Sequence, residues 1–494
     1  MSVIYTSTRG NGGSLKASEA IIKGLADDGG LFVPDKLPEF GFGLDELKDM
    51  DYKETAYAVM SLLLTDYTEE ELRDCINRAY DAKFDTGLIA PLVKKGDKYF
   101  LELFHGKTIA FKDMALSILP YLLTTAIRKN RINKKVVILT ATSGDTGKAA
   151  LAGFSDVEGT EIIVFYPKGG VSRIQELQMV TEKGRNTRVF GVNGNFDDCQ
   201  SGVKAIFNDE ALKKELDEKG YVFSSANSIN IGRLVPQIAY YVYAYGSMLK
   251  SGELEAGEKV NFVVPTGNFG NILAAFYAKK MGLPVGKLIC ASNSNNVLYD
   301  FFKTGEYDKN REFVLTASPS MDILISSNLE RLIYHIAGND PVKNRELMES
   351  LQRNGRYRIT EEMKEGLSDF YGVYATEEQT FAEIRELFNR TGYMIDTHTA
   401  VASFAESVYR NESGDASKNI IISTASPYKF ARSVYKAIKG EVSSEDDFVI
   451  ADDLSDLSKT GIPDAVRQIR NADIIHNKVC ECSEMREAVR GSLV

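Results

Sequence analysis

The sequence has few of the residues that disulfide-rich and metal-binding proteins need. Its five cysteines are scattered and odd in number, which favours a reducing compartment over a disulfide framework. Only Cys480 and Cys482 are close enough in sequence to form a metal or redox pair, but the spacing of a zinc site and a second ligand pair are missing. We therefore predict that the protein has no metal site.

An excess of positive charge is also missing. The net charge is -10, the sequence pI is about 5.3, and no basic patch interrupts the acidic balance. Nucleic acids and anionic membranes repel such a chain, so neither is expected as a partner. The longest apolar runs, residues 117–127 and 234–249, contain Pro120 and Pro236 and are shorter than the ~20 residues that span a bilayer.

Targeting signals, internal repeats and low-complexity blocks are absent as well. The first residues form neither a basic region followed by an apolar core nor an arginine-rich amphipathic presequence. Together with the cysteine usage, this predicts a soluble, cytoplasmic protein.

The sequence does contain an alternation of β-rich and helical stretches along most of its 494 residues. This length exceeds what one hydrophobic core supports, so two or more domains with a cleft between them are expected. Five short apolar runs each end in a turn and lead into a helical stretch, at residues 135–140, 161–166, 260–264, 287–291 and 419–423. Such runs are typical of strands buried on both faces, which predicts an α/β fold with parallel sheets covered by helices.

The ends and the middle of the chain have a different pattern. Two amphipathic runs, residues 52–64 and 69–83, indicate a small helical N-terminal module. Between about 296 and 396 the strand signal fades and charged helix formers dominate, which indicates a helical insertion. We predict an N-terminal module (1–90), a large domain (91–130 and 216–440, with the insertion), a small α/β domain (131–215) and a C-terminal tail packed on the outside (441–494).

A glycine-rich turn follows one of the predicted strands and precedes a helix. This glycine turn (residues 266–271) includes Gly267, Asn268, Phe269, Gly270 and Asn271. Glycines there let successive backbone N–H groups point into one concavity at a helix N-terminus, which makes an anion site without a basic side chain. A plain tight turn is the alternative. The glycine spacing matches neither a dinucleotide fingerprint nor a P-loop, so a phosphate on another kind of ligand is favoured.

A second turn joins the strand at 135–140 to the next helix and carries hydroxyls and a carboxylate. This Asp145 turn (residues 141–147) contains Ser143, Gly144, Asp145 and Thr146. Its N–H groups and hydroxyls could bind a substrate carboxylate, again at a helix N-terminus. Capping of the helix by Asp145 or Thr146 is the alternative. Two anion sites on two strand-turn-helix units suit a ligand with acidic groups at both ends.

Lys112 lies next to Phe111 and Asp113, in mixed apolar and acidic surroundings. Desolvation of such an amine promotes its deprotonated, nucleophilic form, although a lysine before an aspartate is more often a solvated ion pair. Combined with a separate phosphate site, it matches what an enzyme needs to hold pyridoxal phosphate (PLP). His105 and His398 could shuttle protons, or each could serve as a structural hydrogen bonder.

A third turn ends the strand at 419–423. Its hydroxyl groups, Thr424 among them, could hydrogen-bond a pyridine nitrogen without protonating it fully, which would moderate the electron sink of the cofactor. The sequence therefore places possible cofactor contacts after three separate strands.

These residues occur in a set of motifs that resembles the threonine synthase family, specifically its longer bacterial and fungal branch. The similarity covers nearly the whole chain and its motifs follow the order of the family. The motifs are residues 5–10, 28–34, 105–113, 143–147, 227–233, 267–271 and 396–401.

The resemblance implies a fold and a set of roles. The fold is type II of the PLP enzymes, similar to the β subunit of tryptophan synthase, with two parallel-sheet domains. Lys112 is implied to form an imine with PLP, the glycine turn to bind the cofactor phosphate, and Thr424 to face the pyridine nitrogen. Residues 143–146 are implied to hold the substrate carboxylate. Ser228, Asn230 and Arg233, within 227–233, are implied to contribute to binding the substrate phosphate.

The reaction so implied converts O-phospho-L-homoserine and water to L-threonine and phosphate, by β,γ-elimination of phosphate and hydration of the β-carbon. It is the last step of threonine biosynthesis, in the aspartate-family pathway. We expect a small-molecule substrate and a monomer or weak homo-oligomer.

Three positions depart from the pattern of the family. Lys107 and Thr397 replace common prolines, and Ser426 replaces a frequent histidine, so substrate preference or pyridine contacts could differ. Another fold-type II lyase, similar to threonine dehydratase or to a phosphoserine-using synthase, is one alternative. A non-catalytic homologue of threonine synthase is the other.

Overall fold

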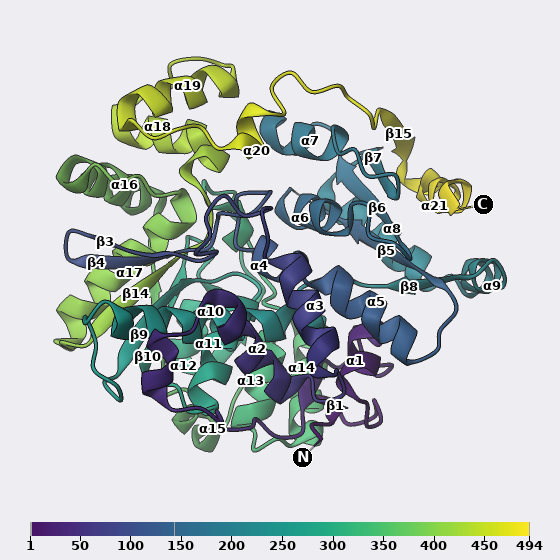
Figure 1. The fold of residues 1–494 in the computed structure, drawn as a ribbon, viewed down its shortest axis with the longest axis horizontal. Helices are drawn as coiled ribbons and strands as arrows, with labels where there is room; N and C mark the ends of the chain where they lie inside the picture. Colours follow the sequence, from purple (N-terminus) through teal and green to yellow (C-terminus); the bar gives the residue numbers. More distant parts are fainter. Residues whose placement is uncertain (1, 143, 494) are drawn as a thin grey trace.

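Two parallel sheets organise the chain in the computed structural model, which describes residues 2–142 and 144–493 (Figure 1). The larger sheet has six strands, parallel except at the β3–β4 edge. Its order is β13 (Phe370–Tyr374), β10 (Val285–Ser292), β9 (Val260–Pro265), β14 (Lys418–Ser423), β4 (Lys98–Glu102) and β3 (Leu92–Lys95). The α/β fold with parallel sheets is thus confirmed.

The smaller sheet has five strands that are all parallel. Its order is β15 (Lys478–Glu481), β7 (Thr187–Asn193), β6 (Thr160–Pro167), β5 (Lys135–Ala141) and β8 (Tyr221–Ser224). All five strands expected from apolar runs are present, as β5, β6, β9, β10 and β14.

The sheets differ from the predicted domain borders at three places. β8 belongs to the small sheet although it lies beyond residue 215, and β15 lies in the predicted outer tail yet pairs with β7. The predicted helical insertion supplies β13, an edge strand of the large sheet. Gly372 interrupts its five residues, so no continuous apolar run marked it. The division into domains otherwise stays a prediction.

The N-terminal module contains the two predicted helices, α2 (Tyr52–Leu63) and α3 (Glu69–Ala79). Asp51 and Thr68 cap them: each side chain accepts a hydrogen bond from the backbone N–H of the glutamate three residues later. The side chain of that glutamate in turn accepts from the backbone N–H of the cap residue. Both bonds satisfy N–H groups that a helix start leaves free. The module also has α1 (Ala17–Lys23), η1 (Leu44–Lys48) and the antiparallel pair β1 (Tyr5–Ser7) and β2 (Phe32–Pro34).

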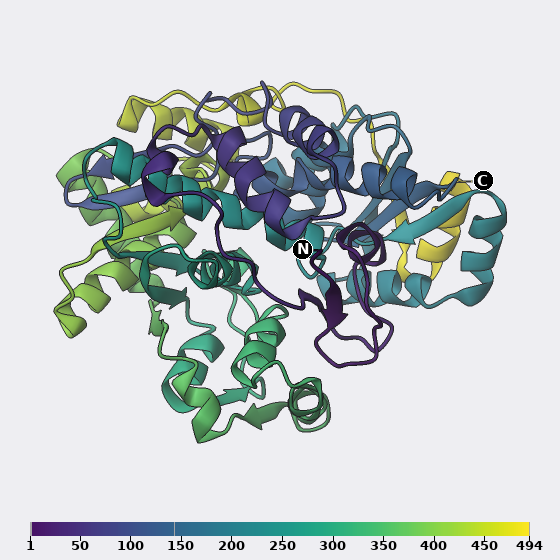
Figure 2. The same cartoon turned by 60° about the horizontal axis from the view of Figure 1, so that its bottom comes forward.

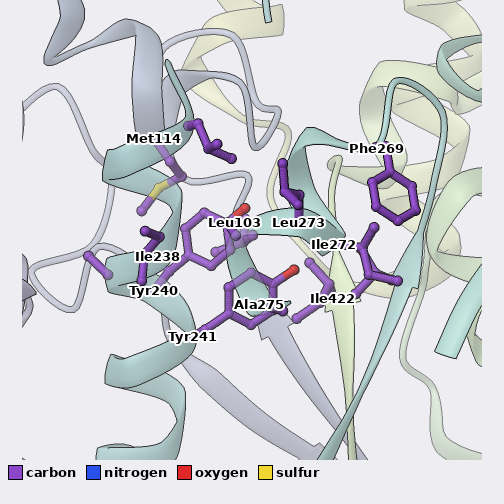
Figure 3. Packing of buried hydrophobic residues seen from close by; sticks show 14 of the residues in the cluster. Leu103, Met114, Ile238, Tyr240, Tyr241, Phe269, Ile272, Leu273, Ala275 and Ile422 are labelled. Carbon is purple, nitrogen blue, oxygen red and sulfur yellow. The ribbon is translucent and has the colours of Figure 1, made fainter. Parts of the chain in front are cut away.

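The core of the large domain forms around α10 (Ile231–Lys250), which is buried on almost every side. Figure 3 shows Tyr240 and Tyr241 of α10 beside Ala275 of α11 (Gly270–Lys280) and Ile422 of β14. These contacts fix the start of α11, where the glycine turn lies.

The remaining helices cover the two sheets. Much of residues 300–360 lies to one side of the two sheets, as Figure 2 shows in green, and contains a small antiparallel pair, β11 (Glu306–Asp308) and β12 (Arg356–Arg358). No helix of the described residues is both long and apolar enough for a membrane span. The other helices are α4 (Asp113–Leu116), α5 (Leu119–Lys129), α6 (Asp145–Phe154), α7 (Arg173–Val180), α8 (Phe196–Phe207), α9 (Glu210–Glu218), α12 (Val297–Thr304), η2 (Pro319–Met321), α13 (Leu329–Ile336), α14 (Pro341–Asn354), α15 (Glu361–Glu365), α16 (Glu377–Thr391), α17 (Thr397–Ser413), η3 (Pro427–Phe430), α18 (Ala431–Lys439), α19 (Asp447–Ser458), α20 (Asp464–Arg467), η4 (Cys482–Glu484) and α21 (Met485–Leu493).

Candidate active site

The Lys112 amine lies where the two sheets face each other. Its Nζ is 3.4 Å from Asp145 Oδ2, which follows β5, and 3.3 Å from Ser320 Oγ, which belongs to η2. The Lys112 side chain is 14% exposed, so a small ligand can reach it while most of its length is covered. The structure thus joins Lys112 to the Asp145 turn, as the sequence predicted for a shared site.

The loop that carries Lys112 is held by its own residues and by the third turn. Asp113 accepts hydrogen bonds from Thr108 N at 2.8 Å and Thr108 Oγ1 at 2.6 Å. Gly106 is required there, since a Cβ would lie 2.5 Å from the Asp113 Cβ. Phe111 N donates to Thr424 O at 2.8 Å. The lysine is therefore preorganised from both sides.

Burial lowers the pKa of the Lys112 amine below its ordinary value. Asp145 opposes this shift by favouring the charged form, whereas Lys429 and Arg233 reinforce it by repulsion. The net direction is toward the free amine, which is the form that attacks a carbonyl carbon.

The glycine turn begins α11 with a left-handed residue. Phe269 has a φ of 65°, and no backbone N–H from Gly267 to Asn271 donates a hydrogen bond to another described residue. A Cβ at Gly267 would lie 2.5 Å from Ser320 O, so only glycine permits this approach. Free N–H groups at a helix N-terminus fit a phosphate.

Neighbouring side chains hold the glycine turn. Asn268 O accepts hydrogen bonds from the backbone N and the Nδ2 of Asn328, each at 3.0 Å. Asn271 Oδ1 accepts from Tyr240 and Tyr241, while its buried Nδ2 has no partner among the described residues. An unpaired buried donor beside the turn is consistent with a ligand acceptor.

Thr424 lies directly after β14 and is 5% exposed. Its carbonyl holds the Lys112 loop, and its hydroxyl makes no hydrogen bond with a described residue. The hydroxyl is therefore available to a ligand, and its contact with a pyridine nitrogen stays a prediction.

The Asp145 turn is shaped by Thr142 and by Gly144. Thr142 Oγ1 accepts from Gly144 N at 2.9 Å and Gly147 N at 3.0 Å. Gly144 has a φ of 144°, and a Cβ there would lie 2.6 Å from Gln175 Nε2. Thr146 is half-buried, and its hydroxyl makes no hydrogen bond with a described residue. Ser143, the other predicted carboxylate contact, lies outside the described residues.

The Asp145 carboxylate contacts more charged side chains than the sequence indicated. Oδ2 contacts Lys112 and accepts from Ser320 Oγ at 3.0 Å, while Oδ1 lies 3.1 Å from Lys429 Nζ and 3.4 Å from Lys148 Nζ. Burial alone raises the pKa of this carboxyl, but the surrounding lysines hold it well below its usual range. Asp145 is thus a charged bridge between the two sheets.

Sequence reasoning did not identify Ser320, Lys148 and Lys429 as residues of the site. Lys148 follows Asp145 by three residues on α6, inside a run of glycine and alanine, which could have marked it as buried. Lys429 ends the third turn, and Ser320 lies in the insertion, where no sequence signal pointed to the site.

Residues 227–233 contribute in two ways. Asn230 is fully buried and caps α10: its Nδ2 donates to Ile21 O and Ser225 O, and its Oδ1 accepts from Gly232 N. That amide is therefore saturated and positions the segment. Ser228 is half-buried, and its hydroxyl makes no hydrogen bond with a described residue.

Arg233 is a buried cation with free hydrogen-bonding capacity. Nη1 donates to Ala226 O at 2.6 Å, and Nε has no partner among the described residues. Burial lowers the pKa of Arg233 to about 10, with Tyr240 opposing the shift. A buried guanidinium without a carboxylate partner fits an anionic ligand group.

The two predicted histidines lie in different surroundings. His398 Nδ1 hydrogen-bonds Asp396 Oδ2 at 2.7 Å, and its Nε2 accepts from Ser320 N at 3.1 Å, so it positions Ser320. His105 lies between Asp85 and Glu102, at 2.5 and 2.9 Å. Burial opposes its charge, but the two carboxylates raise the His105 pKa to about 9. Neither histidine hydrogen-bonds Lys112.

The three departures from the family pattern lie in different surroundings. Thr397 Oγ1 donates to Ala317 O at 2.7 Å, close to η2, and Ser426 Oγ caps η3 by accepting from Tyr428 N. Lys107 is exposed. The effect of these residues on specificity stays a prediction.

Metal-ligand geometry is not present in the part of the chain that the structure describes. No group of three or more histidine, cysteine, aspartate or glutamate side chains there could hold a metal ion. All five cysteines are free, and Cys482 alone is exposed.

The groups near Lys112 fit pyridoxal phosphate. An amine with a lowered pKa is present for its aldehyde, unbonded N–H groups at Gly267 to Asn271 for its phosphate, and the Thr424 hydroxyl for its pyridine nitrogen. All three follow strands of the same sheet, at the carboxyl edge where ligands of α/β proteins bind.

Family models match three consecutive parts of the chain. The model of the threonine synthase N terminus matches residues 4–80, that of the pyridoxal-phosphate-dependent enzymes residues 94–424, and that of the threonine synthase C-terminal region residues 399–478. Together they cover most of the chain, including every candidate site residue.

Individual relatives agree with these matches. Threonine synthase of Saccharomyces cerevisiae is 37% identical over 506 residues, covering 96% of both chains. Human threonine synthase-like 1 is 41% identical over 436 residues, covering 85% of this chain and 58% of that protein, so this chain spans less than two thirds of that relative. The crystal structure of PLP-bound threonine synthase from Brucella melitensis superimposes with a TM-score of 0.85 at 33% identity, covering 99% of both chains.

Proposed function

This chain belongs to the threonine synthase family of pyridoxal-phosphate-dependent enzymes, and we propose that it converts O-phospho-L-homoserine and water to L-threonine and phosphate. The position of Lys112 carries the proposal. Its amine touches the Asp145 turn directly and reaches the glycine turn through Ser320. One nucleophile therefore lies between the turn proposed for the cofactor phosphate and the turn proposed for the substrate carboxylate, as a reaction on bound pyridoxal phosphate requires.

The cofactor contacts follow from the groups left free on the large sheet. The N–H groups of the glycine turn hold the cofactor phosphate, with Asn271 Nδ2 as an additional donor. The Thr424 hydroxyl would hydrogen-bond the pyridine nitrogen without protonating it fully. When bound, pyridoxal phosphate supplies the electron sink that lets protons leave the α- and β-carbons of the substrate.

The substrate lies between the sheets, with each acidic group at a separate anion site. Residues 143–146 hold its carboxylate through backbone N–H groups and hydroxyls. Arg233 and Ser228 hold its phosphate, and the unpaired Arg233 Nε supports this assignment. Asn230 acts indirectly, because its amide is used up in capping α10.

Lys112 moves the protons. Burial lowers the pKa of the amine and so favours its free, basic form, which would remove the α- and β-protons of the bound substrate. The guanidinium of Arg233 stabilises the charge that develops on the departing phosphate. The contacts of Asp145 with Lys429 and Ser320 hold the Asp145 turn beside the lysine, and we propose that this turn keeps water from the bound substrate until phosphate has left.

The remaining context extends from the same proposal. A chain that makes threonine in this way acts last in threonine biosynthesis, within the aspartate-family pathway. We propose that it works in the cytoplasm as a monomer or weak homo-oligomer, without nucleic-acid or membrane partners. The acidic charge balance supports the absence of nucleic-acid partners.

A product assay tests the function. Purified holoenzyme given O-phospho-L-homoserine should release phosphate and form threonine in equal amounts. Release of phosphate with a keto acid in place of threonine would identify a lyase that eliminates without adding water at the β-carbon. No phosphate release by a protein that binds pyridoxal phosphate would contradict the proposal and favour a non-catalytic homologue.

A further inference from the structure

Lys148 is a buried amine that the proposed reaction does not use. Its side chain is 0% exposed, and its Nζ contacts Asp145 Oδ1 at 3.4 Å but makes no hydrogen bond with a described residue. Lysine is rarely buried without a partner, because the charged form loses its hydration. Its position beside the candidate site therefore calls for a functional explanation.

A second lysine amine contacts the same carboxylate oxygen. Lys429 Nζ lies 3.1 Å from Asp145 Oδ1 and donates to Thr108 O at 3.0 Å, and its side chain is also 0% exposed. Two charged amines this close repel each other strongly in a dry environment. Since Lys429 has two acceptors and Lys148 has one distant contact, Lys148 is the amine that loses its proton.

The helix dipole adds to the cost of a charged Lys148. The side chain lies in the first turn of α6, whose N-terminus carries partial positive charge. Burial and then repulsion by Lys429 lower the pKa of Lys148 well below its ordinary value, while Asp145 opposes them. Burial, a neighbouring cation and the helix end all favour the neutral amine.

The surrounding charges leave room for one more anion. On its own helix Lys148 faces Asp145, whose single charge is shared among three lysines, and the helix packed against α6 supplies Asp113, which is bonded twice by Thr108. The titratable or charged groups that face this cluster are Asp145 (α6), Lys112 and Asp113 (start of α4), Lys429 (η3) and His398 (α17).

We propose that Lys148 is a built-in proton acceptor: it is the uncharged partner of Lys429 in the ligand-free site and gains a proton when an anionic group of the substrate enters beside Asp145. The proton comes from solvent and forms the third N–H bond at Nζ, which turns the amine into an ammonium ion. Lys148 then becomes a positioning residue, because the new charge offsets the anion without contacting the reacting carbon. This inference rests on the proposed function only for the identity of that anion.

Calorimetry of the holoenzyme with acetate, a simple carboxylate, as the probe tests this, because the proposed function places the substrate carboxylate at the Asp145 turn. Titrations in buffers of different ionisation enthalpy, at a pH at which acetate is fully ionised, report the protons taken up per bound acetate. We expect an uptake of about one proton. The variant Lys148→Met should lose most of this uptake, while Lys213→Met, an exposed lysine on α9, should keep it.

Each outcome decides the question. No acetate binding, no uptake by the wild type, or equal uptake by Lys148→Met contradicts the inference. If that variant fails to fold, the wild type still decides, since its uptake must fall toward zero as the pH is lowered through the pKa of Lys148. Threonine formation without proton uptake refutes this inference alone, whereas uptake without turnover refutes the proposed function alone.

Discussion

The glycine turn and the Asp145 turn both join a parallel strand to a helix, yet they present different chemical groups to a ligand. The glycine turn offers backbone N–H groups, with close packing against Ser320 and no charged side chain. The Asp145 turn centres on a carboxylate that lies against Lys112, Lys148 and Lys429. The glycine turn is a rigid site whose shape fits one anion. The Asp145 turn holds a cluster of opposite charges whose balance a bound ligand can shift.

Removal of the residue between the two turns should have the largest effect. Lys112→Ala eliminates the base and the nucleophile together, so we expect turnover to fall by about 10^3-fold or more, with loss of the visible absorbance of the bound cofactor. Steady-state assays and an absorbance spectrum check this. Lys204→Ala, at an exposed lysine of α8, is the control and should match the wild type. Normal turnover by Lys112→Ala would sink the mechanism.

Neutralising the Asp145 turn should destabilise the fold. Asp145→Asn leaves buried lysine charges without a carboxylate, which costs about 3 kcal/mol when a buried ion pair loses one partner. Chemical denaturation should show this loss, and the loss should shrink at high pH, where the lysines shed their protons. Asp156→Asn removes an exposed carboxylate paired with Arg185 and should cost much less. Equal effects of the two variants would mean that the Asp145 charge balance is unimportant.

Filling the glycine turn should weaken cofactor binding without altering charge. In Gly267→Ala the new Cβ meets Ser320 O at 2.5 Å, so we expect the affinity for pyridoxal phosphate to drop about 10- to 100-fold. The matched control lies in the same turn: a Cβ at Gly270 meets nothing closer than 3.5 Å, so Gly270→Ala should bind nearly normally. Fluorescence titration of the apoprotein measures both. If Gly270→Ala were as weak as Gly267→Ala, steric fit would not explain the difference.

Arg233 belongs to neither turn and tests whether the substrate phosphate has its own site. Arg233→Ala should raise KM for phosphohomoserine about tenfold and leave the cofactor spectrum intact. The melting temperature should not fall, since the lost cation is buried without a carboxylate partner. An unchanged KM would remove Arg233 from the phosphate site and give that role to one of the two turns.

The smallest effect is expected outside both turns, at His105. Its pKa of about 9 in the folded protein lies above the ordinary 6.5, so its ion pairs stabilise fully below pH ~6.5 and lose their effect as the pH rises through 9. His105→Gln should therefore cost roughly 1 to 2 kcal/mol near pH 6.5, discounted because Asp85 is largely exposed, and close to nothing above pH 10. Denaturation curves at the two pH values decide this. A loss independent of pH would indicate packing rather than charge.

The sequence was most informative where one local pattern decides the structure. Continuous apolar runs predicted β5, β6, β9, β10 and β14, and the glycine turn was found because glycine has a distinct backbone role. The strand β13 escaped because Gly372 interrupts its short run of apolar and aromatic residues at a sheet edge.

The neighbours of Asp145 could not be found in the same way. Ser320 and Lys429 reach it from parts of the chain that only the assembled sheets bring together. Asn230 is the reverse case: the resemblance implied a ligand contact, and the structure shows its side-chain amide used in capping α10, so a contact with substrate stays a prediction. Pairing across the fold depends on tertiary packing, which a local pattern does not encode.

The strand β15 is synthesised late and completes the small sheet by pairing with β7. Asn193 at the end of β7 pairs with Glu481 across 288 residues of chain, so this side of β7 stays without its partner while the whole large domain is being made. An open strand edge attracts other strands, and contacts this distant form slowly. The nascent chain therefore exposes the unpaired edge of β7 until nearly its last helix has emerged from the ribosome. We expect the chain to need a chaperone most during that interval.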